Sequence, residues 1–148
     1  MPFLQAMIKK SCIKPQQLCF EITETSFIHN IERAFECLVE LKKIGCQIAL
    51  DDFGAGFSTF GYLKGFSVDY IKIDGGFVKN VVENRVDRII VRNINELAHA
   101  LEIKTIAEYV ENEDVRNYLM EIGVDFLQGF LCGKPKPLKD IISEGKYA

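Results

Sequence analysis

The chain has 148 residues, of which 48% are hydrophobic and 26% charged, and its formal net charge is −3. These values are typical of one soluble globular domain over residues 1–148, and they argue against a disordered or fibrous protein. Basic runs of at most two lysines argue against binding of duplex nucleic acid, and the chain lacks the apolar stretch of about 18 residues that a membrane span needs. A complete (β/α)8 barrel typically needs about 250 residues, so the length argues against a complete barrel.

Short apolar segments alternate with segments in which apolar residues recur every three or four positions. We expect strands over residues 18–24, 47–52, 69–74, 103–107 and 125–128. We expect a helix from residue 31 with Asn30 as its N-cap and Gly45 as its end, and further helices over 59–64, about 84–101, 113–122 and 138–143. In the longest helix one face carries Val86, Ile90, Ile94, Leu97 and Leu101. The alternation predicts a parallel sheet covered by helices.

The five cysteines are widely spaced, and no two form a C-x-x-C pair. This usage favours free thiols among apolar residues, as in the reducing cytoplasm, over a disulfide framework. We therefore expect a cytoplasmic protein. The two histidines, His29 and His99, are isolated and predict no metal site of imidazole ligands.

A polar side chain stands in or directly after every predicted strand. The set is Glu21, Asp51, Asp52, Lys72, Asp74, Glu108 and Gln128. The carboxyl ends of parallel strands meet at one edge of a sheet, where α/β enzymes build their sites. Carboxylates that converge there repel each other unless a divalent cation binds them, and oxygen ligands favour Mg2+ or Mn2+, with Ca2+ as a further candidate.

This pattern leaves more than one chemistry open. Two divalent cations held by bridging carboxylates hydrolyse phosphoesters, and a nearby lysine orients the water or neutralises the phosphate. An enolase-type site, in which acids hold Mg2+ and a lysine abstracts a proton, fits the same residues. Taken singly, Asp52 or Glu24 is typical of a helix cap or a solvated loop residue, and Lys72 fits a salt-bridge partner as well as a catalytic residue. Gly54 and Gly56 allow a mobile lid over such a site.

Five short segments stand out for their composition and their order. They are Phe20-Glu21-Ile22-Thr23-Glu24, Asp51-Asp52-Phe53-Gly54-Ala55-Gly56-Phe57-Ser58, Lys72-Ile73-Asp74, Glu108-Tyr109-Val110-Glu111, and Gln128-Gly129-Phe130 with Lys134-Pro135. In that order they resemble the E-(I/L)-T-E, D-D-F-G-x-G-(Y/F)-S, K-(I/L)-D, E-G-V-E and Q-G-(Y/F)-x-x-x-K-P motifs of EAL domains, the cyclic-di-GMP phosphodiesterases. The match covers about residues 18–135.

The resemblance implies a TIM-type barrel that hydrolyses cyclic di-GMP to linear pGpG with two Mg2+ or Mn2+ ions. The implied metal ligands are Glu21, Asp51, Asp52 and Glu108, of which Asp51 would bridge both ions. Lys72 would hold or help activate the attacking water, and Glu111 would support the site. Gln128 and Asp74 would bind the substrate. Glu24 would anchor the glycine-rich loop, which in this family couples the metal site to dimer contacts.

The chain departs from the family pattern in two ways. Tyr109 stands where the family usually has glycine, so its side chain is expected to shift Glu108 or crowd the guanine pocket. The tripeptide Glu-Ala-Leu that names the family occurs nowhere, and neither does the family's next strand, which carries a metal-binding asparagine. We therefore expect an incomplete barrel of about five β/α units without its N-terminal strands, and impaired hydrolysis by this chain alone.

Two further readings follow from that expectation. The chain could be a non-catalytic cyclic-di-GMP receptor or interaction module, or a fragment with no function of its own. The retained ligand positions are all intact, which favours a fragment of an active enzyme over a receptor. Expected partners are cyclic di-GMP, a second copy of the chain, and an upstream sensor or diguanylate cyclase domain.

Overall fold

The computed structural model of the protein describes residues 2–11, 13–25, 31–54, 63, 65 and 67–143. Five strands and seven helices lie within those residues. In chain order they are α1 (Pro2–Ser11), the 3-10 helix η1 (Pro15–Gln17), β1 (Cys19–Thr23), α3 (Ile31–Ile44), β2 (Gln47–Phe53), β3 (Tyr70–Ile73), α5 (Gly75–Val78), α6 (Arg85–Ala100), β4 (Lys104–Ala107), α7 (Glu113–Glu121), β5 (Phe126–Leu127) and α8 (Leu138–Ser143).

The strands form one parallel sheet whose order, β1-β2-β3-β4-β5, follows the chain. This confirms the predicted α/β class and the five parallel strands, and the result is a partial barrel. Because all the strands run the same way, their carboxyl ends lie along one edge of the sheet. Each strand begins and ends within a residue or two of its expected range.

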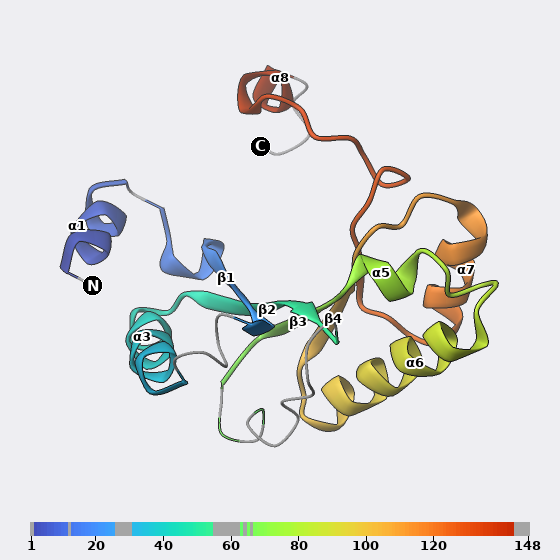
Figure 1. Cartoon of the computed structure of the whole chain (residues 1–148). Coiled ribbons are helices and arrows are strands. Elements are labelled where there is room, and N and C mark those ends of the chain that lie inside the picture. The colour runs from blue at the N-terminus through green and yellow to red at the C-terminus, as the bar shows by residue number, and fades with distance from the viewer. Residues whose placement is uncertain are drawn as a thin grey trace.

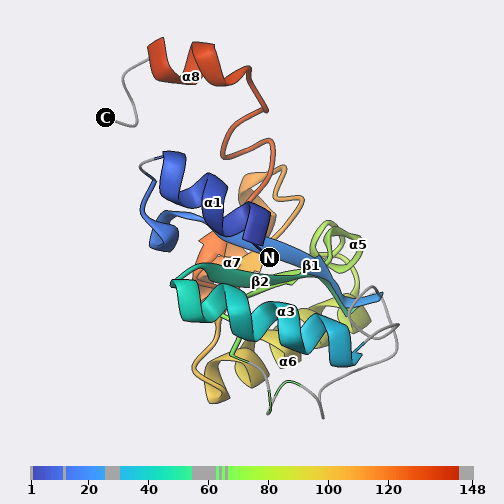
Figure 2. The same cartoon turned by 90° about the vertical axis from the view of Figure 1, so that its left-hand side faces the viewer.

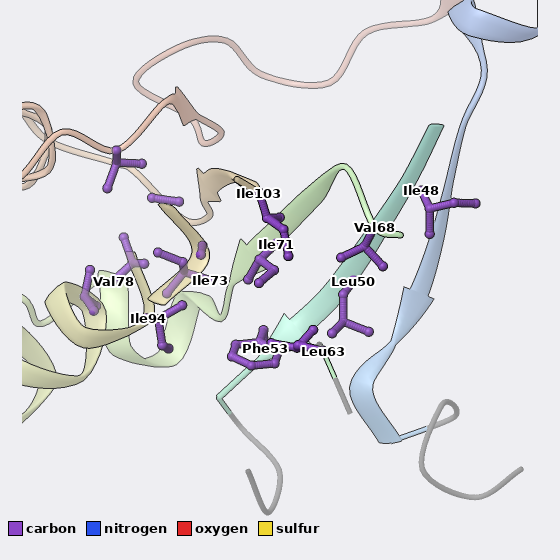
Figure 3. Packing of buried hydrophobic residues seen from close by; sticks show 14 of the residues in the cluster. Ile48, Leu50, Phe53, Leu63, Val68, Ile71, Ile73, Val78, Ile94 and Ile103 are labelled. Atoms are coloured by element: carbon purple, nitrogen blue, oxygen red, sulfur yellow. The ribbon is translucent and has the colours of Figure 1, made fainter. Parts of the chain in front are cut away.

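The helices lie on two sides of the sheet. In both views α3 and α6 lie on one side, whereas α1 and α8 lie on the other (Figures 1 and 2). The hydrophobic core fills the first side, where Ile48 and Leu50 of β2 and Ile71 and Ile73 of β3 are fully or almost fully buried (Figure 3). Alternate strand residues point to the opposite, concave face. That alternation sends Asp51 and Lys72 away from the core.

Local signals explain where the helices begin and end. The side chain of Asn84 accepts hydrogen bonds from two backbone N–H groups at the start of α6, and Asn112 does the same for one at the start of α7. Gly45 after α3 and Gly123 after α7 have φ values of +99° and +77°, which favour glycine. The expected ends of these helices at the two glycines are confirmed.

Two details of the helices differ from expectation. Val86 is 62% exposed, so it does not belong to the buried face of α6, whereas Val91, Asn95 and Ala98 on that helix are buried. The buried stripe includes a polar residue and an alanine, which a search for large apolar side chains passes over. The short helix α5 was not expected, and it begins with two glycines, a residue type of low helix propensity.

Some expected features lie outside the described residues. They are the Asn30 cap, most of the helix over 59–64 and the part of the glycine-rich loop that contains Gly56. Within the part of the chain that is described, no helix is both long enough and apolar enough to span a membrane.

Candidate metal centre

Lys72 lies at the centre of the carboxylates that the strand ends bring together. Its Nζ is 2.7 Å from Asp51 Oδ1, 2.8 Å from Glu108 Oε1 and 3.2 Å from Glu21 Oε2. The Lys72 side chain is 5% exposed, whereas that of Glu21 is 51% exposed. These residues come from four neighbouring elements of the sheet edge: β1, β2, β3 and the segment after β4. One buried ammonium thus holds three carboxylates within reach of one another.

A β-bulge explains how two consecutive aspartates reach this place. Between the paired residues Leu50 and Phe53, β2 has two residues, Asp51 and Asp52, where β3 has only Lys72. Asp52 also has a φ of +55°, in the left-handed region that non-glycine residues rarely adopt. In a regular strand the two side chains would point to opposite faces. The bulge and the left-handed backbone of Asp52 together allow the Asp51 and Asp52 carboxylates to lie near Glu108.

The residues at this edge fit a divalent cation. Carboxylate oxygens of Asp51, Asp52 and Glu108 lie within 4.8 Å of one another, which is a spacing that one cation can bridge. Asp51 Oδ1 is buried, and within the described chain it accepts no hydrogen bond of good geometry, although it forms the ion pair with Lys72. A buried carboxylate needs positive charge beside it, which Lys72 supplies here and to which a divalent cation would add.

Burial and mutual repulsion shift the pKa values of these groups. Burial, together with the nearby charges of Asp51 and Asp74, raises the pKa of the Asp52 carboxyl. Burial is also the largest cause of the raised pKa of Glu108, and it outweighs the opposing contact with Lys72. For Lys72, burial lowers the pKa, but hydrogen bonds to Asp51 and Glu108 outweigh that effect and raise it well above its ordinary value. Lys72 is therefore protonated at neutral pH.

Glu24 connects this edge to the glycine-rich segment. It follows β1, is only 1% exposed, and its Oε2 accepts a hydrogen bond of 3.1 Å from the backbone N–H of Gly54. Gly54 has a φ of +100°, and a Cβ there would lie 3.0 Å from Ile94 Cδ1 and 3.2 Å from Phe77 Cε2. The hydrogen bond to the buried Glu24 side chain and the lack of room for a side chain at Gly54 thus fix the backbone where the chain leaves β2.

A cavity of about 490 Å3 opens beside the carboxylates. Asp74, Glu111 and Gln128, which the motifs single out, all line it together with Asp52 and Glu108. Asp74 Oδ1 also accepts a hydrogen bond from Gly76 N and so caps α5. Tyr109, which was expected to crowd the substrate pocket, also lines it, whereas the lining side chains of Lys79 and Phe130 were not predicted as site residues. The aromatic position of the Gln128-Gly129-Phe130 motif was the available signal for Phe130.

A second cavity, of about 770 Å3, lies on the concave face of the sheet. Glu21 and Gln128 line it, together with exposed apolar groups such as Phe126 and two lysines of the C-terminal segment, Lys134 and Lys136. Glu21 contacts Lys72 but is not part of the group of three carboxylates near a single cation position.

Comparison with known proteins decides the family. The EAL domain model matches residues 1–135. The chain belongs to the EAL domain family. This confirms the resemblance that the five motifs carry, and the similar solved structures confirm the barrel-type fold.

Several relatives of this EAL domain are named as cyclic di-GMP phosphodiesterases. It is 43% identical over 138 residues to the cyclic di-GMP phosphodiesterase PdeF of Escherichia coli, covering 93% of this chain and 18% of PdeF. It is 48% identical over 126 residues to the cyclic di-GMP phosphodiesterase PdeB of Shewanella oneidensis, covering 85% of this chain and 15% of PdeB. The chain thus spans less than a fifth of the length of these relatives.

Solved EAL structures superpose closely on the chain. The PaMucR phosphodiesterase in complex with c-di-GMP gives a TM-score of 0.89 at 33% identity, over 93% of this chain and 56% of that one. The EAL domain of Mycobacterium smegmatis DcpA gives 0.87 at 35% identity, over 95% of this chain and 63% of that one.

Proposed function

We propose that this EAL domain hydrolyses cyclic di-GMP to linear pGpG at divalent cations, Mg2+ or Mn2+, held at the carboxyl edge of its sheet. The observation that carries the proposal is the buried Lys72 ammonium, which contacts Asp51, Glu108 and Glu21. Two of these, Asp51 and Glu108, form with Asp52 a group of carboxylates that one cation can bridge. The relatives that are named as cyclic di-GMP phosphodiesterases support it.

The proposed cation ligands are Glu21, Asp51, Asp52 and Glu108. By the resemblance to EAL domains Asp51 would bridge two ions, and its carboxylate lies in one group with those of Asp52 and Glu108. When bound, such cations lower the pKa of water and neutralise charge on the phosphate. The raised pKa values of Asp52 and Glu108 show that these groups are crowded by negative charge and by burial, as expected of a site built to receive a cation.

Lys72 is protonated, and this limits the roles that it can have in the reaction. An ammonium cannot accept a proton, so Lys72 is unsuited to the proton abstraction that an enolase-type site requires. It can donate hydrogen bonds to an attacking water or to a phosphate oxygen. It has three N–H donors and three carboxylate partners. Glu21 is the most distant and most exposed of these partners, so we assign it as the one that Lys72 releases when it orients the water.

The substrate would lie in the cavity beside the carboxylates. Gln128 offers an amide donor and acceptor there, and Asp74 and Glu111 offer acceptors. Glu24 would anchor the glycine-rich segment through Gly54 and so keep Asp51 and Asp52 in place. We assign Glu111 a supporting role, because it lines the cavity but is exposed.

The proposal extends to partners and location. MucR of Pseudomonas aeruginosa is a bifunctional diguanylate cyclase and cyclic di-GMP phosphodiesterase, which supports a cyclase or sensor domain as a partner of this one. A second copy of the chain is a further proposed partner. The described cysteines, Cys19, Cys37, Cys46 and Cys132, are free thiols, which supports a cytoplasmic location.

The direct test is incubation of the purified chain with cyclic di-GMP and Mn2+, followed by chromatography of the products. We expect pGpG to form slowly and only when the metal is present. Calorimetry with cyclic di-GMP distinguishes the other reading. Tight binding without pGpG, even at enzyme concentrations above that of the substrate, would overturn hydrolysis and support a receptor.

A further inference from the structure

Tyr109 has an unusual backbone for its residue type. Its φ is +59°, in the left-handed region, and it directly follows the proposed cation ligand Glu108. The described chain has two other non-glycine residues with positive φ, Asp52 and Glu102, and Asp52 lines the same cavity as Tyr109. Strained positions of this kind concentrate at functional sites, where the surrounding structure holds them in place. Glycine would adopt this backbone without strain, so the presence of tyrosine at this position calls for a functional explanation.

Hydrogen bonds on both sides hold the Tyr109 backbone. The N–H of Glu108 donates to Ile73 O at 3.3 Å, which ties the preceding residue to β3. The N–H of Val110 donates to Gln128 O at 3.0 Å, which ties the following residue to the turn after β5. Tyr109 therefore lies between two fixed points, and Lys72 still contacts Glu108 at 2.8 Å. Glu108 thus keeps its contact with Lys72 beside the tyrosine.

The Tyr109 side chain forms one wall of the cavity of about 490 Å3. A Cβ on Gly75 would lie 2.7 Å from Tyr109 Cβ, so the tyrosine packs closely against the start of α5. It is nevertheless 53% exposed, and it lines the cavity with Phe130 and Gln128. Lys134 Nζ lies 5.5 Å from the centre of the Phe130 ring. Tyr109 therefore presents a large exposed aromatic surface beside the carboxylates.

The chemistry of this wall points to a planar, hydrogen-bonding ligand. Aromatic side chains stack on nucleobases whatever the base, because every base has a π-face. Gln128 can bond to the edge of a stacked base, and the Lys79 ammonium on the same cavity can attract a phosphate. The volume is within the range of sites that hold a small-molecule ligand.

We propose that Tyr109 is the stacking platform for one base of the nucleotide substrate and so determines binding at this site. The inference rests on the proposed function for the identity of the substrate. Tyr109 acts on substrate binding and leaves the chemical step to the carboxylates and Lys72. A side chain that merely filled space would change folding stability and leave the Michaelis constant alone.

Substitution separates the two roles. For Tyr109→Gly we expect KM for cyclic di-GMP to rise between about 5-fold and 150-fold, with kcat within about 3-fold of the parent. Tyr109→Phe keeps the ring and should keep KM. An unchanged KM in Tyr109→Gly overturns the proposal, and so does an equal rise in the two variants.

A second measurement does not depend on turnover or on folding of the glycine variant. The chain has no tryptophan, so Tyr109→Trp introduces a single fluorescent reporter at the wall. We expect GMP to quench its emission and ribose 5-phosphate, which lacks the base, to leave it unchanged. In the control Met120→Trp, at an exposed position of α7, neither should quench. Equal responses to the two ligands would overturn stacking.

The two proposals fail separately. If GMP quenches Tyr109→Trp selectively but no pGpG forms from cyclic di-GMP, then the hydrolytic function is wrong and the stacking role stands. If pGpG forms but Tyr109→Gly leaves KM unchanged, the stacking role is wrong and the function stands.

Discussion

Asp51 and Lys72 face each other across the bulge between β2 and β3, with Oδ1 and Nζ 2.7 Å apart. The contact places a buried positive charge against Asp51, a proposed cation ligand. It also raises the pKa of the lysine, through hydrogen bonds that outweigh the opposite effect of burial. The contact with Asp51 thus helps to keep Lys72 in its charged form, and the first prediction concerns this pair.

Replacement of Lys72 by alanine should slow hydrolysis much more than it weakens binding. The variant loses the donor that orients the attacking water or the phosphate, so we expect kcat for cyclic di-GMP to fall at least about 100-fold. KM should stay within about 3-fold. Steady-state kinetics by product chromatography measures both, with the exposed Lys10→Ala on α1 as the matched control. A kcat equal to that of the control would contradict the assigned role.

Glu24 should be needed for the stability of the segment that follows β2. In Glu24→Ala the backbone N–H of Gly54 loses its acceptor, so the free energy of unfolding should fall by about 1–3 kcal/mol. Glu24→Gln keeps an acceptor oxygen and should lose less. Urea denaturation followed by circular dichroism measures the differences. The exposed Glu40→Ala on α3 should be close to the parent, and an equal loss in Glu40→Ala and Glu24→Ala would argue against the anchor.

Substitution by alanine should change the free energy of unfolding differently at Gly129 and at Gly133. A Cβ on Gly129 would lie 2.3 Å from both the backbone N and O of Val110, whereas a Cβ on Gly133 would meet no atom within 4 Å. Gly129→Ala should therefore cost about 1–3 kcal/mol of unfolding free energy or more, and it should move Gln128. Gly133→Ala should be nearly neutral. Thermal denaturation of the two variants measures the contrast, and equal melting temperatures would contradict it.

The Asp125 carboxylate should make the free energy of unfolding depend on pH in the acidic range. Its Oδ2 accepts a 2.9 Å hydrogen bond from Thr105 N and lies 2.9 Å from His99 Nε2. Burial raises the pKa of Asp125, but these contacts outweigh it and hold the pKa below its ordinary value of 3.8. The carboxylate therefore stabilises the fold at pH above that value, and the stabilisation is lost as the pH falls through the lowered pKa.

We accordingly expect Asp125→Asn to lose about 1 kcal/mol of unfolding free energy at pH 7 and to approach the parent below pH 3.8. Urea denaturation of parent and variant over this range tests the expectation. The exposed Glu83→Gln should show no such convergence. A difference between Asp125→Asn and the parent that stays constant with pH would exclude the carboxylate as its source.

The strand ends could be predicted from the sequence, and the contacts between them could not. Asp51, Lys72 and Glu108 follow apolar runs, and a parallel sheet brings such positions to one edge. The bulge that admits both Asp51 and Asp52 arises from the pairing of β2 with β3, and no local pattern in either strand encodes it. The contact between Lys72 and three carboxylates depends on that pairing as well.

The helices show a similar division. The ends of α7 could be predicted from Asn112 and Gly123, because capping is local chemistry. Most of the buried face of α6 could also be predicted, because Ile94 is buried and Ile90, Leu97 and Leu101 pack against the core, but the burial of Asn95 could not. The amide of Asn95 donates to Ile122 O at 2.9 Å, and its oxygen accepts from the buried Thr105 hydroxyl at 2.6 Å. Hydrophobic periodicity does not predict the burial of a polar residue whose hydrogen-bond partners are distant in sequence.

The most direct test of the proposed site is single-turnover conversion of cyclic di-GMP by the parent chain and by Asp51→Asn, each measured with Mn2+ and with a chelator. The substitution keeps the size of the side chain and removes the charge of a proposed cation ligand that lies in one group with Asp52 and Glu108. We predict that pGpG forms only with the parent chain and only in Mn2+. Equal pGpG formation by Asp51→Asn, or formation by the parent in the chelator, would contradict a metal-dependent site at these carboxylates.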